Sequence, residues 1–174
     1  MKAAILGFGT VGSGAYEVIS RSSEDISVKR VLDIRPNPDI TDKLTNDISD
    51  IISDDEIITV AETMGGLHPA FEYVSSAMMA GKNVVTSNKK LVAAYYEELM
   101  SLAARKNVAF RFSAAAGGGI PWLFNIIRRS VTEKIDKIQG IINGTTNYVL
   151  DSMETRGISF VEALLEAQKL GYAE

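Results

Sequence analysis

The chain has 174 residues and a formal net charge of −4, enough length for one full domain and part of a second. The acidic balance argues against nucleic-acid binding, because such proteins normally present a basic face. There is no cysteine and one histidine, His68, which excludes a disulfide framework and a thiolate or multi-histidine metal site. The apolar run in "MKAAILGFG" is too short for a signal peptide or a membrane span, so we expect a cytoplasmic protein with no membrane partner.

The first 112 residues alternate short apolar runs with segments of helical period. In the helix after the first strand, Val11, Ala15, Val18 and Ile19 are expected on the buried face. Strands alternating with helices predict an α/β fold with a doubly wound parallel sheet covered on both faces. The predicted strands are 2–6, 26–33, 55–62, 83–86 and 108–112, and the predicted helices are 10–23, 68–82 and 90–106.

The pattern changes at "SAAAGGGIP", residues 113–121. Beyond it we expect a helix over 122–131, a strand over 134–143 and helices over 145–157 and 159–171. Ser159 and Glu162 form a capping-box pattern at the start of the last helix. We therefore expect two domains: a nucleotide-binding domain over 1–112, and over 113–174 the first part of an α+β catalytic and dimerisation region.

A glycine-rich stretch joins the first predicted strand to the first predicted helix. Gly7 permits a tight turn, Gly9 lets the backbone approach a pyrophosphate, and Gly12 allows the helix and the strand to pack closely. The helix N-terminus adds N–H groups that bind phosphate. This setting favours a Rossmann-type dinucleotide site over a ligand-free turn. The candidate cofactor residues of the loop are Gly7, Phe8, Gly9, Thr10, Val11 and Gly12.

Asp33 ends the second predicted strand, at the distance where an acidic residue holds the ribose hydroxyls of NAD. Arg35 lies two residues further on and could instead pair with the 2′-phosphate of NADP, or be a solvated loop charge. The residues leave the choice between NAD and NADP open.

Five motifs occur in a fixed order: "VAETMGG" (60–66), "AGKNVVTSNKKLVA" (80–93), "GGGIP" (117–121), "GIINGTTNYVL" (140–150) and "EAQKLGYAE" (166–174). Together they resemble the homoserine dehydrogenases over nearly the whole chain. The resemblance implies NAD(P)-dependent interconversion of L-homoserine and L-aspartate 4-semialdehyde, in threonine and methionine biosynthesis. It resembles the stand-alone form of the enzyme, not the fusion with an aspartokinase.

Members of that family continue past "GYAE" with a segment that carries an Asp and a second catalytic Lys. We therefore expect this stretch alone to be inactive and the full-length protein to be a homodimer. Two other interpretations are another Rossmann oxidoreductase acting on an amino-acid substrate, and a non-catalytic nucleotide-binding fragment.

Lys89 follows the predicted strand 83–86, at the carboxyl edge of the sheet where ligands bind. A lysine there can stabilise a developing alkoxide or exchange a proton with it. The resemblance implies that Lys89 is catalytic and that Thr63, Ser87, Asn88 and Gly171 contact the cofactor. Glu62 is either part of this site or only a strand-end residue.

Asn143, Gly144 and Thr145 lie in the "NGTT" turn before a predicted helix. From the residues alone, an Asn-Gly turn with a threonine cap is the simpler interpretation. The resemblance implies instead that these three residues contact the substrate's carboxylate or carbonyl. It also implies that Tyr172 and Glu174 contact substrate, with the glutamate holding the ammonium group.

Several relatives hold a sodium ion on backbone carbonyls that correspond to Ala116, Gly118 and Ile120. Their fourth ligand is a carboxylate at the position of Ser113. A hydroxyl is a weaker ligand than a carboxylate for a hard cation. The sequence therefore argues against a bound sodium ion, although three carbonyls could still hold one.

Overall fold

The computed structural model describes residues 1–22, 25–140 and 143–172. The chain divides into two compact units, Met1–Gly118 and Gly119–Glu174. Each unit has a hydrophobic core of its own, with two clusters in the first and one in the second. The boundary predicted between residues 112 and 113 lies slightly earlier, where the glycine-rich segment begins.

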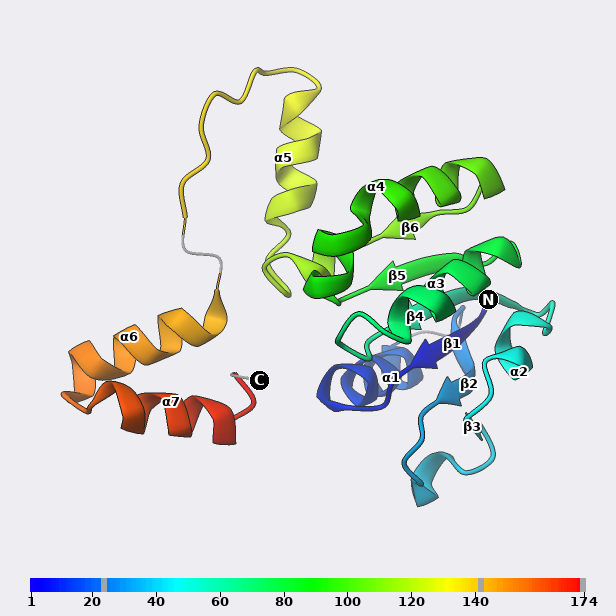
Figure 1. The fold of residues 1–174 in the computed structure, drawn as a ribbon, viewed down its shortest axis with the longest axis horizontal. Helices are drawn as coiled ribbons and strands as arrows, with labels where there is room; N and C mark the ends of the chain where they lie inside the picture. The colour runs from blue at the N-terminus through cyan, green and yellow to red at the C-terminus, as the bar shows by residue number, and fades with distance from the viewer. Residues whose placement is uncertain (23–24, 141–142, 173–174) are drawn as a thin grey trace. The chain divides into compact units, whose positions relative to one another are not determined.

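The first unit contains a six-stranded sheet in the order β3-β2-β1-β4-β5-β6, and every pair of neighbouring strands is parallel (Figure 1). The strand order reverses between β1 and β4, the point where doubly wound sheets bind ligands at their carboxyl edge. The predicted sheet is confirmed. Its strands are β1 (Lys2–Leu6), β2 (Ser27–Leu32), β3 (Leu44–Thr45), β4 (Ile57–Glu62), β5 (Asn83–Thr86) and β6 (Phe110–Arg111).

Helix α1 (Thr10–Ser22) packs on one face of the sheet through Ala15 and Ile19, against Ile5 of β1. The side chains that alternate with Ile5 belong to the other core cluster, together with residues of α3 (Ala70–Met79) and α4 (Lys89–Lys106). The expectation for Val11 and Val18 is wrong: they are 55% and 62% exposed. Tyr16 packs against the core cluster instead.

The expectation that helices cover both faces holds only in part within the first unit. Val84 of β5 is fully buried under α3 and α4, but its neighbour Val85 on the opposite face is 40% exposed. The reason is the topology, because both of these crossover helices contribute to the same core cluster and α1 contributes to the other.

Three short elements between β2 and β4 were not predicted: a 3₁₀ turn over Pro38–Ile40, β3, and helix α2 (Ser49–Ile52). A local signal for α2 was present. The Asp47 carboxylate accepts a hydrogen bond from the N–H of Ser49 at 2.8 Å, and Ile51 is fully buried. A four-residue helix is too short to show a periodic apolar pattern.

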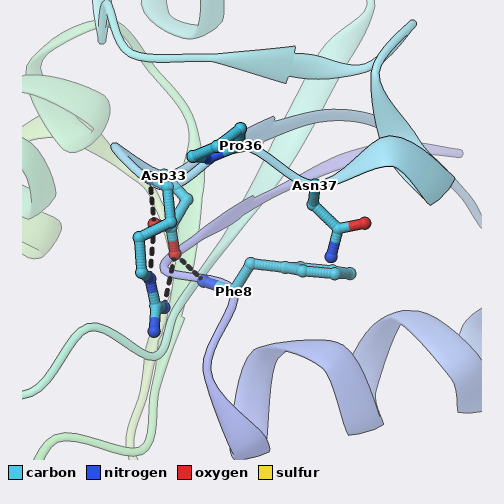
Figure 2. A pocket seen from close by; sticks show the side chains of 5 residues that line it. Phe8, Asp33, Pro36 and Asn37 are labelled. Atoms are coloured by element: carbon cyan, nitrogen blue, oxygen red, sulfur yellow. Dashed lines mark hydrogen bonds and ion pairs between the residues drawn. The ribbon is translucent and has the colours of Figure 1, made fainter.

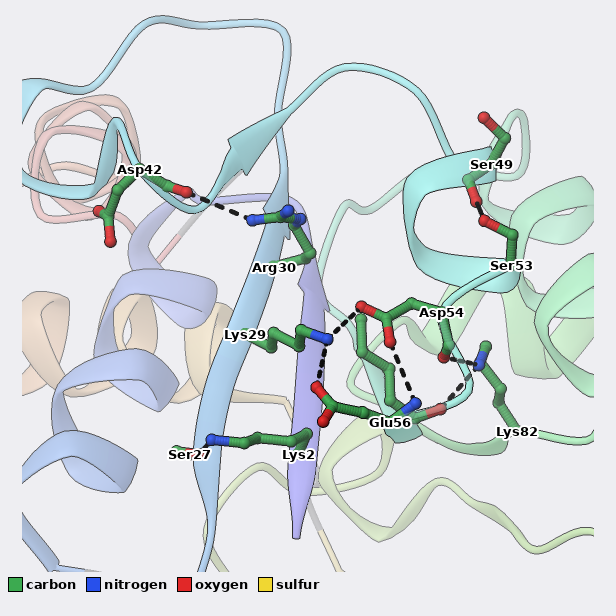
Figure 3. A network of polar contacts seen from close by, with 11 residues as sticks. Lys2, Ser27, Lys29, Arg30, Asp42, Ser49, Ser53, Asp54, Glu56 and Lys82 are labelled. Atoms are coloured by element: carbon green, nitrogen blue, oxygen red, sulfur yellow. Dashed lines mark hydrogen bonds and ion pairs between the residues drawn. The ribbon is translucent and has the colours of Figure 1, made fainter.

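A polar network ties the loop before β4 to its neighbours (Figure 3). The Nζ of Lys29 lies 2.6 Å from Asp54 Oδ2 and 2.5 Å from Glu56 Oε2. The hydrogen bond between Lys29 and Asp54 raises the pKa of the lysine and lowers the pKa of the aspartate. Lys82 donates to the carbonyls of Asp54 and Ile57 at 2.7 Å, and its burial lowers its pKa. The network lies at the amino ends of β4 and β5, away from the ligand-binding edge.

The second unit contains α5 (Trp122–Ser130), α6 (Gly144–Arg156) and α7 (Phe160–Lys169). Helices α6 and α7 pair through Val149, Ala163 and Ala167, which are buried. The predicted capping box of Ser159 and Glu162 is present at the start of α7.

The strand predicted over 134–143 is wrong for the residues described there, 134–140 and 143, which form no strand. Residues 141 and 142 lie outside the described residues. A strand needs a neighbour to satisfy its backbone N–H and C=O groups. The described part of the second unit offers no such neighbour, so the apolar residues of this segment do not by themselves make a strand here. None of the described helices is both long enough and apolar enough to cross a membrane.

Candidate cofactor-binding and active site

Gly7 makes the turn that follows β1. Its φ is +89°, a conformation that side chains with a Cβ rarely adopt. A Cβ at Gly7 would lie 2.9 Å from the Cα of Met64. The N–H of Gly7 donates to the carbonyl of Leu32 at 2.8 Å, so the turn is fixed between β2 and the segment after β4.

Gly12 allows α1 to approach this turn. A Cβ at Gly12 would lie 2.0 Å from the carbonyl oxygen of Gly7 and 2.7 Å from Thr63 Oγ1. The Thr63 hydroxyl lies 2.8 Å from the Gly7 carbonyl and 3.1 Å from the Leu6 carbonyl. Thr63 therefore directs its hydroxyl into the loop, where it fixes the shape of the phosphate site. Its predicted cofactor contact stays a prediction.

Gly9, by contrast, faces open space. The nearest heavy atom to a Cβ built there is Arg35 Nη2, at 4.0 Å. The first backbone bond of α1 runs from Ser13 N to the carbonyl of Gly9 at 2.9 Å. The N–H groups of Thr10, Val11 and Gly12 therefore have no partner within the helix. A helix N-terminus beside an open glycine is a suitable cradle for a phosphate, so the loop fits the dinucleotide that its sequence predicts.

Asp33 and Arg35 form one side of a pocket next to this loop, lined also by Phe8, Pro36 and Asn37 (Figure 2). Asp33 Oδ2 accepts from the N–H of Phe8 at 2.6 Å and from Arg35 Nη2 at 2.9 Å. Asp33 Oδ1 accepts from the backbone N–H and the Nε of Arg35 at 2.9 and 3.0 Å. The Arg35 guanidinium holds the pKa of the Asp33 carboxyl far below its usual range.

The two side chains differ in exposure. The Asp33 side chain is 7% exposed and the Arg35 side chain is 66% exposed. Both oxygens of Asp33 are engaged, so the charged surface that this pocket presents to a ligand is the guanidinium. The arrangement suits a phosphate better than a pair of ribose hydroxyls.

Lys89 is the first residue of α4, directly after the carboxyl end of β5, and its side chain is exposed. Asn88 is the N-cap of this helix and is 6% exposed; its Oδ1 accepts from the N–H of Leu91 at 3.1 Å. Ser87 is half-buried, and its N–H donates to the carbonyl of Glu62 at 3.1 Å. The cofactor contacts predicted for Ser87 and Asn88 stay predictions.

In the second unit, Asn143 caps α6, its Oδ1 accepting from the N–H of Thr146 at 2.9 Å. The Thr145 hydroxyl donates to the carbonyl of Tyr172, and the Tyr172 ring lies 5.0 Å from that of Tyr148. The structure thus brings Asn143, Gly144, Thr145 and Tyr172 together at one end of α6. Gly171, with φ +79°, follows the C-cap of α7 and precedes Tyr172. Glu174 lies outside the described residues.

The predicted sodium ligands fall on both sides of the unit boundary, with Ala116 and Gly118 in the first unit and Ile120 in the second. Among the described residues, no group of three or more His, Cys, Asp or Glu side chains could hold a metal ion. The expectation that sodium is not bound stays a prediction.

A parallel sheet of this order, with a glycine turn at its switch point and a phosphate cradle at the start of α1, defines a Rossmann-type NAD(P)-binding fold. Residues 7–113 match the family model "Homoserine dehydrogenase, NAD binding domain", and residues 121–174 match "Homoserine dehydrogenase". The chain belongs to the homoserine dehydrogenase family.

Known homoserine dehydrogenases are similar to this chain along its whole length. A homoserine dehydrogenase of Pseudomonas aeruginosa is 40% identical, over all of this chain and 43% of its own length. The crystal structure of a Thiobacillus denitrificans homoserine dehydrogenase is 39% identical with a TM-score of 0.87, again over all of this chain and 43% of the other. A hyperthermophilic archaeal homoserine dehydrogenase in complex with NADPH is 26% identical, with a TM-score of 0.80 over 63% of its length. The chain thus spans under half the length of the curated relatives it matches.

Proposed function

We propose that the full-length protein containing this chain interconverts L-homoserine and L-aspartate 4-semialdehyde with a nicotinamide cofactor. Family membership along the whole chain supports the proposal. The observation that carries it is the position of Lys89 at the carboxyl edge of β5, the edge that also carries the phosphate loop. The bound cofactor would supply or accept the hydride at the substrate's C4.

Different residues of this chain would then bind the cofactor, act on the substrate oxygen and bind the substrate's polar groups. The loop of Gly7, Gly9 and Gly12 binds the pyrophosphate, and Lys89 stabilises charge on the substrate oxygen or exchanges its proton. The polar groups of the substrate are bound by residues at the start of α6 and by two residues later in the chain: Asn143, Gly144, Thr145, Tyr172 and Glu174. A homodimer, a cytoplasmic location and a place in threonine and methionine synthesis belong to the same proposal.

The test is the oxidation of L-homoserine by the full-length protein, with NAD and NADP in parallel, followed by the absorbance of the reduced nicotinamide. We expect turnover with at least one cofactor. Turnover only with other amino-acid substrates would point to a different oxidoreductase. Cofactor binding without turnover of any substrate would overturn the enzymatic proposal and favour a nucleotide-binding module.

Arg35→Ala tests which cofactor the pocket beside Asp33 selects. We propose that Arg35 pairs with the 2′-phosphate of NADP, because its guanidinium is exposed while Asp33 is engaged. Losing a charge-assisted hydrogen bond should raise the KM for NADP by roughly 10- to 100-fold. The KM for NAD should stay the same or fall, because Asp33 loses the two side-chain donors of Arg35 and can accept from ribose hydroxyls in their place.

The matched control is Arg21→Ala. Arg21 is exposed at the end of α1 and pairs with Glu17 at 2.6 Å, so its loss should change neither KM. An Arg35→Ala variant whose KM values for NADP and NAD change by the same factor would refute the assignment.

A further inference from the structure

A buried carboxylate, that of Glu62, ends β4 and has no part in the chemistry described above. Its register neighbours are Leu6 of β1 and Thr86 of β5, so it sits between the strand before the phosphate loop and the strand before Lys89. The residue is fully buried. Burying a carboxylate is costly unless hydrogen-bond donors replace the water that it loses.

Three donors surround this carboxylate. Oε2 accepts from the Thr86 hydroxyl at 2.5 Å. Oε1 accepts from the N–H of Met64 at 2.8 Å and from the side-chain amide of Asn88 at 3.4 Å. Thr86 is the last residue of β5, and Met64 and Asn88 lie in the segments that follow β4 and β5. One carboxylate therefore joins the segment carrying Thr63 to the segment carrying Lys89.

The bonds continue from Thr86 to the start of α4. Because the Thr86 hydroxyl gives its hydrogen to Glu62, its oxygen is free to accept from the N–H of Asn88, at 2.9 Å. The Asn88 side chain donates to the carbonyl of Gly66 at 2.6 Å and caps α4 through Leu91. Lys89 follows this cap directly, so its backbone is held by the network.

We propose that Glu62 is a positioning residue that holds Lys89 in place for the reaction, through Thr86 and Asn88. The inference rests on the proposed dehydrogenase function. All three partners donate to Glu62, so the position requires a group that only accepts hydrogen bonds. Glutamine has nearly the same shape, but its amide nitrogen donates. Placed toward Thr86, it would make that hydroxyl accept and turn its hydrogen elsewhere, and the bonds from Met64 and Asn88 would lose the carboxylate charge.

Glu62→Gln in the full-length protein tests this role. We expect kcat for L-homoserine oxidation to fall roughly 10- to 100-fold, as when a catalytic group is displaced by about 1 Å. The Kd of the cofactor should change by less than about 3-fold. The primary deuterium isotope effect on kcat should increase, because hydride transfer becomes slower relative to product release; a smaller folded fraction would leave that ratio unchanged.

Two comparisons make the test specific. In a Lys89→Ala background, Glu62→Gln should cause almost no further loss of kcat, because the two residues would act as one unit. Thr86→Val should reproduce the loss and Thr86→Ser should restore activity, which keeps the test decisive if Glu62→Gln does not fold. Glu98→Gln, on the exposed side of α4, is the control and should behave like the unmodified protein.

Losses that multiply in the double variant, or an unchanged isotope effect with a lower kcat, would assign Glu62 a purely structural role and overturn the inference. An unmodified protein that binds cofactor and does not oxidise homoserine would instead overturn the proposed function, and this inference with it.

Discussion

Lys89→Ala should lower kcat for L-homoserine oxidation by roughly 10²- to 10⁴-fold, the usual contribution of a group that transfers a proton in the transition state. The Kd of the cofactor should change little, because the groups that would bind its phosphates are N–H groups at the start of α1. Lys89 begins a different helix, α4. Steady-state kinetics and cofactor titration on the same preparation measure both quantities.

Lys90→Ala is the matched control, because it removes the same charge one position further along α4. Its kcat should stay within about 3-fold of the unmodified protein. Equal losses in the two variants would mean that the helix start needs positive charge in general. A Lys89→Ala variant with unchanged kcat would remove Lys89 from the reaction.

The parts of the fold that follow from local rules could be predicted from the sequence. The glycine spacing is a local pattern, in which Gly12 approaches the turn made by Gly7 five residues earlier. The strands of the first unit are short apolar runs between clear turns. The exposure of Val11 and Val18 could not be predicted in this way. Helical period gives which residues share a face, but it does not give which side of that face packs on the sheet, here Tyr16 and not Val11 or Val18.

Two further outcomes depended on partners far away in the chain. The segment 134–143 was predicted as a strand, and the described part of the second unit contains no strand for it to pair with. For Glu62, the structure shows an interaction that the sequence did not predict. An acidic residue at a strand end is usually solvated. Only the structure shows that the Glu62 carboxylate is buried, beside its register neighbour Thr86 and in contact with the Asn88 side chain. Glu62 lies 24 residues before Thr86 and 26 residues before Asn88 in the sequence.

The glycines of α1 give the second large expected effect. Gly12→Ala should destabilise the protein by about 1–3 kcal/mol, as overpacking in a tight site does, and should abolish measurable cofactor binding. The reason is steric: the new Cβ would lie 2.0 Å from the carbonyl oxygen of Gly7, which is backbone and cannot turn aside. Thermal unfolding and cofactor titration measure the two effects.

Gly14→Ala is the control for the same substitution in the same helix. A Cβ at Gly14 meets no atom within 4 Å, so alanine should raise stability by about 0.4–1 kcal/mol by restricting the unfolded chain and should leave the cofactor's Kd unchanged. Two alanines two residues apart should therefore shift stability in opposite directions. If Gly12→Ala bound the cofactor as tightly as Gly14→Ala, the close approach of α1 to the Gly7 turn would not be what shapes the phosphate site.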